Sequence, residues 1–123
     1  IYVGGRTLAN AQEEFDRIED AVGACKTAVR GGYVRGAGSE LVDIAYNGSF
    51  TNDFSNVLFA PFHKIMDNAN ITQLPIPANI PFNVKTKQLD SNLLDPTNVI
   101  ITALLNSFAL TTLLINTSYI LHD

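Results

Sequence analysis

The sequence predicts a mainly α-helical protein with short β-strands and a hairpin, and three observations carry this prediction. Apolar residues recur at helical spacing over the first thirty positions. A glycine-rich turn then opens a second helical segment. A long uncharged segment, introduced by Asp95-Pro96, closes the chain. At 123 residues, length alone predicts a single domain.

The first predicted helix carries a stripe of apolar side chains at alternating spacings of three and four residues. The stripe consists of Leu8, Ala11, Phe15, Ile18, Val22, Cys25 and Val29. Either Thr7 or Asn10 can cap its start, and Asn10 has Glu13 at the capping-box distance. Gly31-Gly32 is expected to end the helix. Cys25 lies in the stripe, so we interpret it as a small core residue.

Residues 31–38 form a glycine-rich loop around a very short strand, and Ser39 is the predicted N-cap of a helix over residues 41–45. A glycine-rich turn that opens a helix exposes backbone N–H groups to anions. This turn lacks the spacing of the phosphate loop, so by itself it predicts only a turn. A polar loop is expected over 47–56 and a helix over 57–70, with Pro61 kinking or restarting it. His63 is interpreted as a structural or surface residue.

Prolines exclude a helix over residues 74–89, which we predict to be extended or a small hairpin with Phe82-Asn83-Val84 near its middle. Asp95 fits the N-cap and Pro96 the first position of the last long helix. That helix is predicted to end near Ile115, and residues 117–121 to form a strand.

Composition excludes several classes of protein. The chain has 12 acidic and 8 basic residues, a net charge of −4 and no Lys/Arg cluster, which disfavours nucleic-acid binding. Hydrophobic residues make up 46% of the chain, which is enough for a core and disfavours disorder. A single Cys excludes an internal disulfide, and no Cys/His metal motif is present. The start at Ile1 has no signal-peptide features and is not Met, so we expect a piece or a processed form.

Charge is missing mainly near the C-terminus. Charged residues make up 16% of the chain, against about 25% for an average soluble domain, and residues 96–122 carry none. A membrane helix needs about 20 apolar residues. Polar residues interrupt this segment and no Lys or Arg flanks it. We therefore favour a helix that is buried on nearly every side, inside a domain or against a neighbour, and a membrane span is the outlier.

Three short sequence blocks, taken in their order along the chain, indicate a protein family. Val3-Gly4-Gly5 leads into a helix carrying Arg17-Ile18-Glu19-Asp20-Ala21, and Val34-Arg35-Gly36-Ala37-Gly38 follows. Asp95-Pro96-Thr97-Asn98-Val99 then opens the last helix. In order and spacing these blocks resemble the C-terminal part of group I chaperonins, the GroEL-like protein-folding machines. The resemblance runs from residue 1 to 123 and is weakest over 70–94, where this chain is a few residues shorter.

The resemblance implies two partial domains. Residues 1–30 would be the returning half of the intermediate domain, and residues 31–123 the C-terminal half of the mainly helical equatorial domain, which binds ATP and builds the ring. It also implies a cytoplasmic protein with identical ring subunits, unfolded client proteins and, as one option, a co-chaperonin, and neither nucleic acid nor membrane as a partner. ATP and Mg²⁺ are the implied cofactors. The family's phosphate loop and metal-binding Asp would precede Ile1, so ATPase activity is expected of a full subunit and not of this chain alone.

Asp20 is the catalytic residue that the resemblance implies. In the family, the Asp of this motif positions the water that attacks the γ-phosphate, and a carboxylate suits that role. The competing interpretation is a solvated acid beside the apolar stripe.

The resemblance also implies a nucleotide site. Its residues are Gly36, Ala37, Gly38, Asn83, Val84, Leu93 and Asp95. The glycine triplet would pack on the nucleotide sugar, but Ala37 replaces its middle glycine, and a Cβ disfavours both close approach and positive φ. Asp95 would accept hydrogen bonds from the ribose hydroxyls.

The base would lie against the remaining site residues. Asn83 offers both a donor and an acceptor to a base edge. Val84 and Lys85 are bulkier than the family's alanines, and Leu93 would pack on the adenine.

Two functions therefore compete. The first is the C-terminal part of an ATP-driven chaperonin subunit. The second is a truncated assembly module without ATPase activity, which would keep an edge strand over residues 116–121 for a neighbouring subunit. High Asn content and low charge hint at a divergent relative, with a virus as a candidate source.

Overall fold

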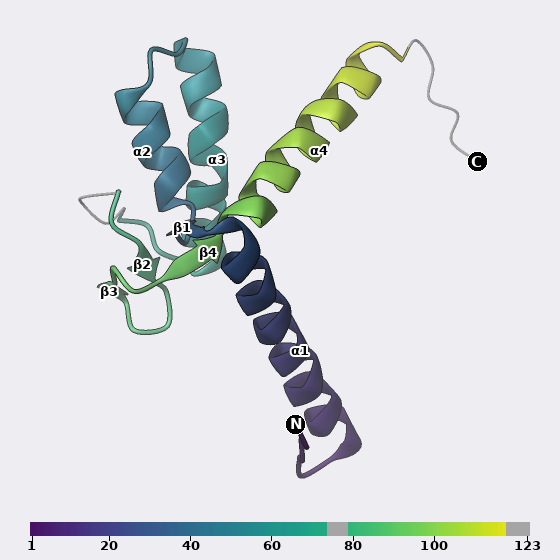
Figure 1. Cartoon of the computed structure of the whole chain (residues 1–123). Coiled ribbons are helices and arrows are strands. Elements are labelled where there is room, and N and C mark those ends of the chain that lie inside the picture. The colour runs from purple at the N-terminus through teal and green to yellow at the C-terminus, as the bar shows by residue number, and fades with distance from the viewer. Residues whose placement is uncertain (74–78, 118–123) are drawn as a thin grey trace. The chain divides into compact units, whose positions relative to one another are not determined.

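The computed structural model describes residues 1–73 and 79–117 of the chain. The described part is mainly helical, as predicted, and contains only short strands (Figure 1). The elements in chain order are α1 (Leu8–Gly31), β1 (Tyr33–Arg35), α2 (Ser39–Asn47), α3 (Asn52–Asn68), β2 (Phe82–Asn83), β3 (Gln88–Leu89), β4 (Leu94–Pro96) and α4 (Thr97–Ile115).

The chain divides into two compact units. The first unit is Ile1–Gly32 with Pro96–Asp123, and the second unit is Tyr33–Asp95. The two-domain assignment implied by the resemblance, 1–30 and 31–123, stays a prediction.

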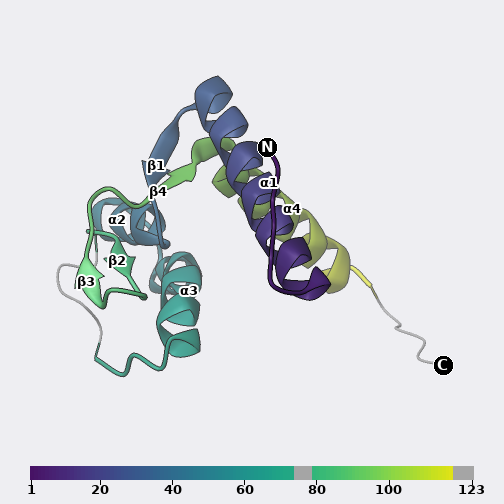
Figure 2. The same ribbon diagram turned by 90° about the horizontal axis from the view of Figure 1, so that it is seen from below.

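The second unit has a hydrophobic core of its own. Its helices α2 and α3 pack against each other, and the β2–β3 hairpin lies beside them (Figure 2). The buried core residues are Val42, Phe62, Met66 and Phe82, and the partly buried residues packed on them are Phe59, Ile65, Ile71 and Val84. Apolar side chains at helical spacing on two short helices thus find partners within this unit.

The predicted hairpin is confirmed. Strands β2 and β3 are antiparallel, with Phe82 opposite Leu89 and Asn83 opposite Gln88. Residues 74–78 of the predicted extended segment lie outside the described residues. A second two-stranded sheet pairs β1 with β4, which brings the segment before the last helix beside the glycine-rich loop.

The boundaries of α2 and α3 differ from the predicted ones. Ser39 is the first residue of α2, and Gly38 occupies the N-cap position, so the predicted Ser39 cap is wrong. The predicted polar loop is also too long, because α3 already begins at Asn52. The hydroxyl of Thr51 accepts a hydrogen bond from the Phe54 backbone N–H at 3.4 Å, and this cap starts the helix within the polar run.

Helix α3 is otherwise close to the prediction. It continues through Pro61 and ends at Asn68. His63 is exposed on it and stacks on Phe59 with ring centroids 6.0 Å apart, which confirms the surface interpretation.

Helix α1 begins and ends as predicted. Of the two candidate caps, Thr7 holds the position, and its hydroxyl accepts the Asn10 backbone N–H at 3.2 Å. Gly32 terminates the helix with φ of +79°, and its N–H donates to the Ala28 carbonyl at 2.8 Å. A residue with a Cβ is disfavoured at this left-handed position, which explains the glycine.

Helix α4 ends at Ile115 as predicted but begins one residue later than expected. Pro96 occupies the N-cap position without a side-chain cap, and Asp95 belongs to strand β4, so the predicted Asp95 cap is wrong. The start of α4 is held to the end of α1, since the Thr97 N–H donates to the Gly32 carbonyl at 3.1 Å. A Cβ at Gly31 would collide with the side chain of Asn98, which is exposed and would have to turn away. The predicted strand over 116–121 falls outside the described residues from position 118 onward.

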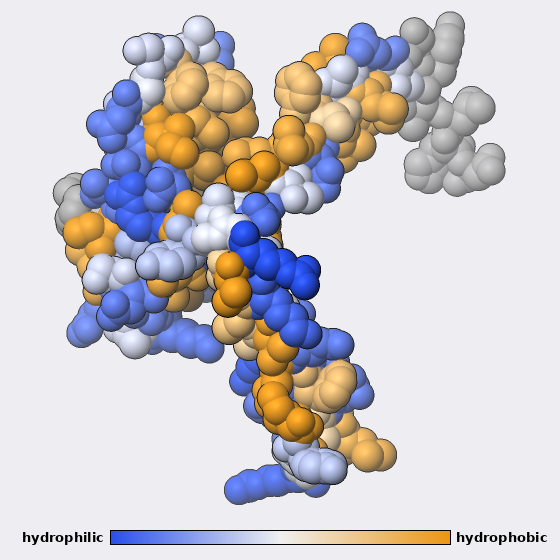
Figure 3. Space-filling view, viewed as in Figure 1, coloured by the Kyte–Doolittle hydropathy of each residue, from blue (hydrophilic) through white to orange (hydrophobic). Residues whose placement is uncertain are grey.

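The apolar surfaces of α1 and α4 are exposed within the described chain (Figure 3). No residue of either helix is buried. Burial of the last helix against a neighbour therefore stays a prediction, but burial within this chain is wrong both for that helix and for Cys25. The reason is that no further layer among the described residues covers them. Helix α4, with a mean hydropathy of 1.8, is long and apolar enough to cross a membrane, a property shared by core helices of soluble proteins.

Candidate functional site

A tight turn, Gly36-Ala37-Gly38, joins β1 to α2 and forms the centre of the candidate site. Gly36 donates its N–H to the Leu93 carbonyl at 2.9 Å, and Ser39 donates its N–H to the Gly36 carbonyl at 3.0 Å. Ala37 and Gly38 both have positive φ, +53° and +75°. Two successive left-handed residues reverse the chain and start the helix.

Close backbone contacts favour glycine at both ends of the turn. A Cβ at Gly36 would lie 3.0 Å from the Leu93 carbonyl oxygen. A Cβ at Gly38 would lie 3.0 Å from the backbone nitrogen of Phe62 on α3. The turn therefore packs closely against the segment before β4 on one side and against helix α3 on the other.

Ala37 is strained, as the sequence predicted for a Cβ at this position. A left-handed conformation costs a residue with a Cβ about 1–2 kcal/mol. Its backbone N–H lies close enough to the Asp95 carboxylate to lower the pKa of that carboxyl. The turn and strand β4 thus bring Ala37 and Asp95 close together. The nucleotide-binding roles that the resemblance implies for them stay predictions.

The Asp95 carboxylate is half-buried beside the turn. Burial raises the pKa of this carboxyl above its ordinary value, and the Ala37 N–H acts in the opposite direction. The net effect is a carboxylate that is poorly solvated. Such a group gains from any further hydrogen-bond donor, including a sugar hydroxyl.

Asn83 uses its carboxamide within its own hairpin. Its oxygen accepts the backbone N–H groups of Lys85 and Thr86 at 3.1 and 3.3 Å, and its nitrogen donates to Asp90 at 3.4 Å. A base edge would have to compete with these partners. Val84 packs on the core of the second unit, so its predicted place at the base stays a prediction.

Leu93 contributes its backbone to the turn, through the bond from Gly36. Its side chain is half-buried. No described contact assigns that side chain to a ligand, and its predicted packing on adenine stays a prediction.

Sequence reasoning missed an ionic cluster beside the turn. Arg35, the residue before Gly36, donates to Glu40 at 2.9 Å and to Asp43 at 2.7 Å. Hydrogen bonds from Arg35 hold the pKa of the Asp43 carboxyl below its ordinary value. Two acids three residues apart on one helix face, just after an arginine, were the signal that could have revealed it.

Asp20 lies on α1, in the first unit, and its side chain is exposed. The turn and Asp95 belong to the second unit, so the catalytic assignment of Asp20 stays a prediction. Among residues 1–73 and 79–117, no group of three or more His, Cys, Asp or Glu side chains is arranged to hold a metal ion.

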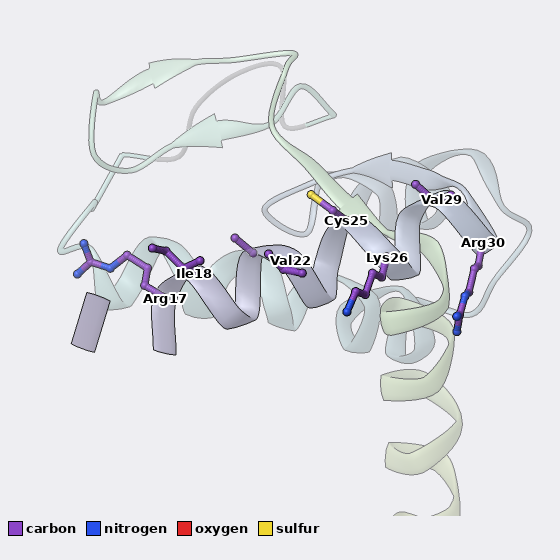
Figure 4. A pocket seen from close by; sticks show the side chains of 8 residues that line it. Arg17, Ile18, Val22, Cys25, Lys26, Val29 and Arg30 are labelled. Atoms are coloured by element: carbon purple, nitrogen blue, oxygen red, sulfur yellow. The ribbon is translucent and has the colours of Figure 1, made fainter. Parts of the chain in front are cut away.

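A concave surface lies along α1 and combines apolar and basic side chains (Figure 4). Ile18, Val22, Cys25 and Val29 supply its apolar lining, and Arg17, Lys26 and Arg30 the cationic groups. None of the residues that the resemblance implies for the nucleotide site lines this surface.

Comparison with known proteins supports the resemblance. No family model matches the sequence. Curated relatives do match: chaperonin GroEL of Orientia tsutsugamushi and the GroEL proteins of its Boryong and Ikeda strains, each 31% identical over 146 aligned positions. The alignments cover 100% of this chain and 26% of each relative, so the chain spans about a quarter of their length. The similarity extends over the whole chain and supports a GroEL-like chaperonin fragment.

Proposed function

We propose that this chain is the C-terminal part of a GroEL-like chaperonin subunit, which assists protein folding in a ring of identical subunits. The proposal rests on similarity to GroEL over the whole chain. Under it, residues 1–30 belong to the intermediate domain and residues 31–123 to the equatorial domain. A cytoplasmic location, client proteins and a co-chaperonin belong to the same proposal.

The glycine turn and Asp95 form the nucleoside side of an ATP site in this proposal. The observation that carries it is the half-buried Asp95 on strand β4, which pairs with β1 and so lies beside the turn. The turn presents backbone without large side chains, and the carboxylate has oxygens left to accept ribose hydroxyls. These residues therefore fit a nucleoside.

The described residues do not supply the triphosphate side of the site. They contain no acidic cluster for Mg²⁺. When bound, Mg·ATP would supply the phosphoryl group and its charge neutralisation. In the proposed mechanism Asp20 accepts a hydrogen bond from the attacking water and so orients it.

A second candidate function is an assembly module that has lost nucleotide binding. The observations that favour it are the Cβ of Ala37 in the turn, the occupied carboxamide of Asn83 and the packing of Val84 in the core. All three reduce the room or the free polar groups for a nucleotide. The two candidates differ in ATP binding and agree on assembly.

The test measures ATP binding and hydrolysis by the full-length subunit that contains this chain. We expect Asp95→Asn to weaken ATP binding about tenfold, because it removes a charged acceptor. Asp67→Asn, an exposed aspartate of the same unit, is the matched control and should leave binding unchanged. Equal affinities for the wild type and the Asp95 variant would reject the proposed site.

Asp20 is tested separately, because its role is in hydrolysis. Asp20→Asn should preserve ATP binding and lower turnover about a hundredfold, while the neighbouring Glu19→Gln should have no effect. Turnover that survives Asp20→Asn counts against the assignment.

Assembly distinguishes the two candidates from an unrelated protein. A ring that binds no ATP supports the assembly module. A protein that stays monomeric at every concentration in native mass spectrometry rejects both candidates.

A further inference from the structure

The guanidinium of Arg35 joins three separate segments of the second unit. Its Nε donates to Glu40 Oε2 at 2.9 Å, and one terminal nitrogen donates to Asp43 Oδ2 at 2.7 Å. The other terminal nitrogen donates to the backbone carbonyl of Asn79 at 3.2 Å. We call Arg35, Glu40, Asp43 and Asn79 the Arg35 clasp.

The clasp closes across the glycine turn. Arg35 is the last residue of β1, and Glu40 is the second residue of α2, so the pair brackets the turn and Ser39. Glu40 Oε2 also accepts a hydrogen bond from the Arg35 backbone N–H at 3.4 Å. Glu40 therefore binds both the main chain and the side chain of Arg35. Asp43 is held in turn by the side-chain amide of Asn79 at 3.4 Å and that of Asn47 at 3.1 Å.

The turn needs support of this kind because its conformation is strained. Left-handed residues that carry a Cβ persist only when the surroundings fix them, and Ala37 is such a residue. On the strand side, the bond from Gly36 to Leu93 holds the turn. On the helix side, the clasp supplies charge-assisted bonds in the forked geometry that only arginine offers.

The clasp is also better shielded than the other arginine pairs described. Arg35 is 35% exposed and its two acids 27%, whereas Arg17 on α1, which pairs with Glu13 and Glu14, is 61% exposed. Partial burial weakens screening by solvent and salt, so these bonds hold geometry better than surface pairs do.

We propose that Arg35 is a positioning residue: its ion pairs with Glu40 and Asp43 hold Gly36-Ala37-Gly38 in the conformation that presents the turn and Asp95 to a nucleoside. This inference rests on the proposed nucleotide site. Arg35 itself does not touch the nucleotide, and it acts on affinity through the turn.

The experiment compares Arg35→Gln, Arg35→Lys and the control Arg17→Gln in the full-length protein. Steady-state ATP hydrolysis gives KM and kcat, and amide hydrogen exchange reports on the turn and the core. For Arg35→Gln we expect KM to rise about fivefold with kcat within about twofold, because binding and not chemistry is affected. Exchange at Gly36 and Ser39 should accelerate while exchange at Met66, in the core, stays unchanged.

Arg35→Lys provides the conservative rescue. An ammonium group can reach one carboxylate but cannot fork between two, so its KM should fall between those of the wild type and Arg35→Gln. Arg17→Gln should match the wild type in every readout.

Two results would overturn the proposal. One is an Arg35→Gln protein with unchanged KM and unchanged exchange at the turn. The other is a fall in kcat at constant KM with faster exchange at Met66, because that pattern means general unfolding. If the wild type neither binds nor hydrolyses ATP, the proposed function fails, and exchange at Gly36 and Ser39 alone decides whether Arg35 holds the turn.

Discussion

The two units of this chain differ in the burial of their apolar residues. In the second unit, Phe62 and Met66 are 1% and 0% exposed and form a core with α2 and the hairpin. In the first unit, Phe108 and Leu113 of α4 are 74% and 63% exposed. Helix α4 is nevertheless more apolar than α2 or α3 of the second unit. Apolar content alone therefore does not make a core, because burial needs a second element to pack against.

The largest effect is expected in the core of the second unit. Phe62→Ala should lower the free energy of unfolding by about 4 kcal/mol, because it deletes a buried aromatic ring and leaves a cavity. Phe54→Ala on the same helix removes a half-exposed ring and is the control. Urea denaturation measures both; equal costs would mean that the described core is not the stabilising one.

A smaller loss is expected at the turn. Gly38→Ala should cost about 2 kcal/mol, since it combines a left-handed conformation with a Cβ that crowds Phe62. In the first unit, Gly23→Ala meets no atom within 4 Å and lies inside α1, so it should stabilise the protein by up to about 1 kcal/mol. Thermal unfolding measures both variants, and a shift of the two melting temperatures in the same direction would contradict this contrast.

The neighbouring position should respond with the opposite sign. Ala37→Gly relieves the left-handed strain and should stabilise the second unit by about 0.5 kcal/mol after the entropy cost of glycine. Lys87→Gly, at φ of +55° in the hairpin, is the matched control and should give a similar gain. Only Ala37→Gly should also tighten ATP binding, which isothermal titration measures; an equal change for both variants would count against the nucleotide site.

Two carboxylates of the second unit should show opposite pH dependence. The pKa of Asp43 is lowered, so its stabilisation is present above the ordinary aspartate pKa and is lost as pH falls through the folded value. The pKa of Asp95 is raised, so the folded protein binds a proton at this carboxyl more tightly than the unfolded chain does. Its contribution to stability is therefore present below the ordinary aspartate pKa and is lost as pH rises through the higher pKa of the folded protein.

The asparagine variants measure these two contributions. Relative to the wild type, Asp95→Asn should gain stability from acid to neutral pH, and Asp43→Asn should lose it. Urea midpoints at several pH values provide the measurement. Parallel curves for the wild type and both variants would contradict the two environments described.

The smallest effect is expected on α4. Leu113→Gln should change the stability of the 123-residue chain by no more than about 0.5 kcal/mol, because the side chain is exposed there and both residues favour helices. In the full-length protein the same substitution should cost about 2 kcal/mol or more, because the proposed equatorial domain would cover α4. A negligible cost in both would break the proposed domain assignment.

Local signals explain most of what the sequence predicted correctly. Thr7 and Gly32 bound α1 because capping depends on residues within one helical turn. The hairpin follows from prolines and a short extended run. The glycine triplet was identified by its motif, and the positive φ of Ala37 agrees with the expected conflict between a Cβ and the turn.

The failures share one physical cause, which is packing between elements that local sequence patterns do not show. Asp95 has the sequence of a helix cap, but pairing of β4 with β1 places it in a strand beside the turn instead. Ser39 also looks like a cap, yet its buried hydroxyl finds no hydrogen-bond partner within the described residues. The contact of Arg35 with Asn79 escaped prediction because the two residues lie 44 positions apart along the chain, whereas the ion pairs with Glu40 and Asp43 are local.

By itself, the sequence determined the mainly helical class, the two ends of α1, the glycines of the turn and the resemblance to a chaperonin, because propensity, capping and motif spacing act over a few neighbouring residues. Tertiary structure decided which apolar faces are buried, that Asp95 serves the turn and not α4, and that Arg35 closes the turn. These features depend on contacts between segments far apart in sequence, and such contacts are set only when the elements pack.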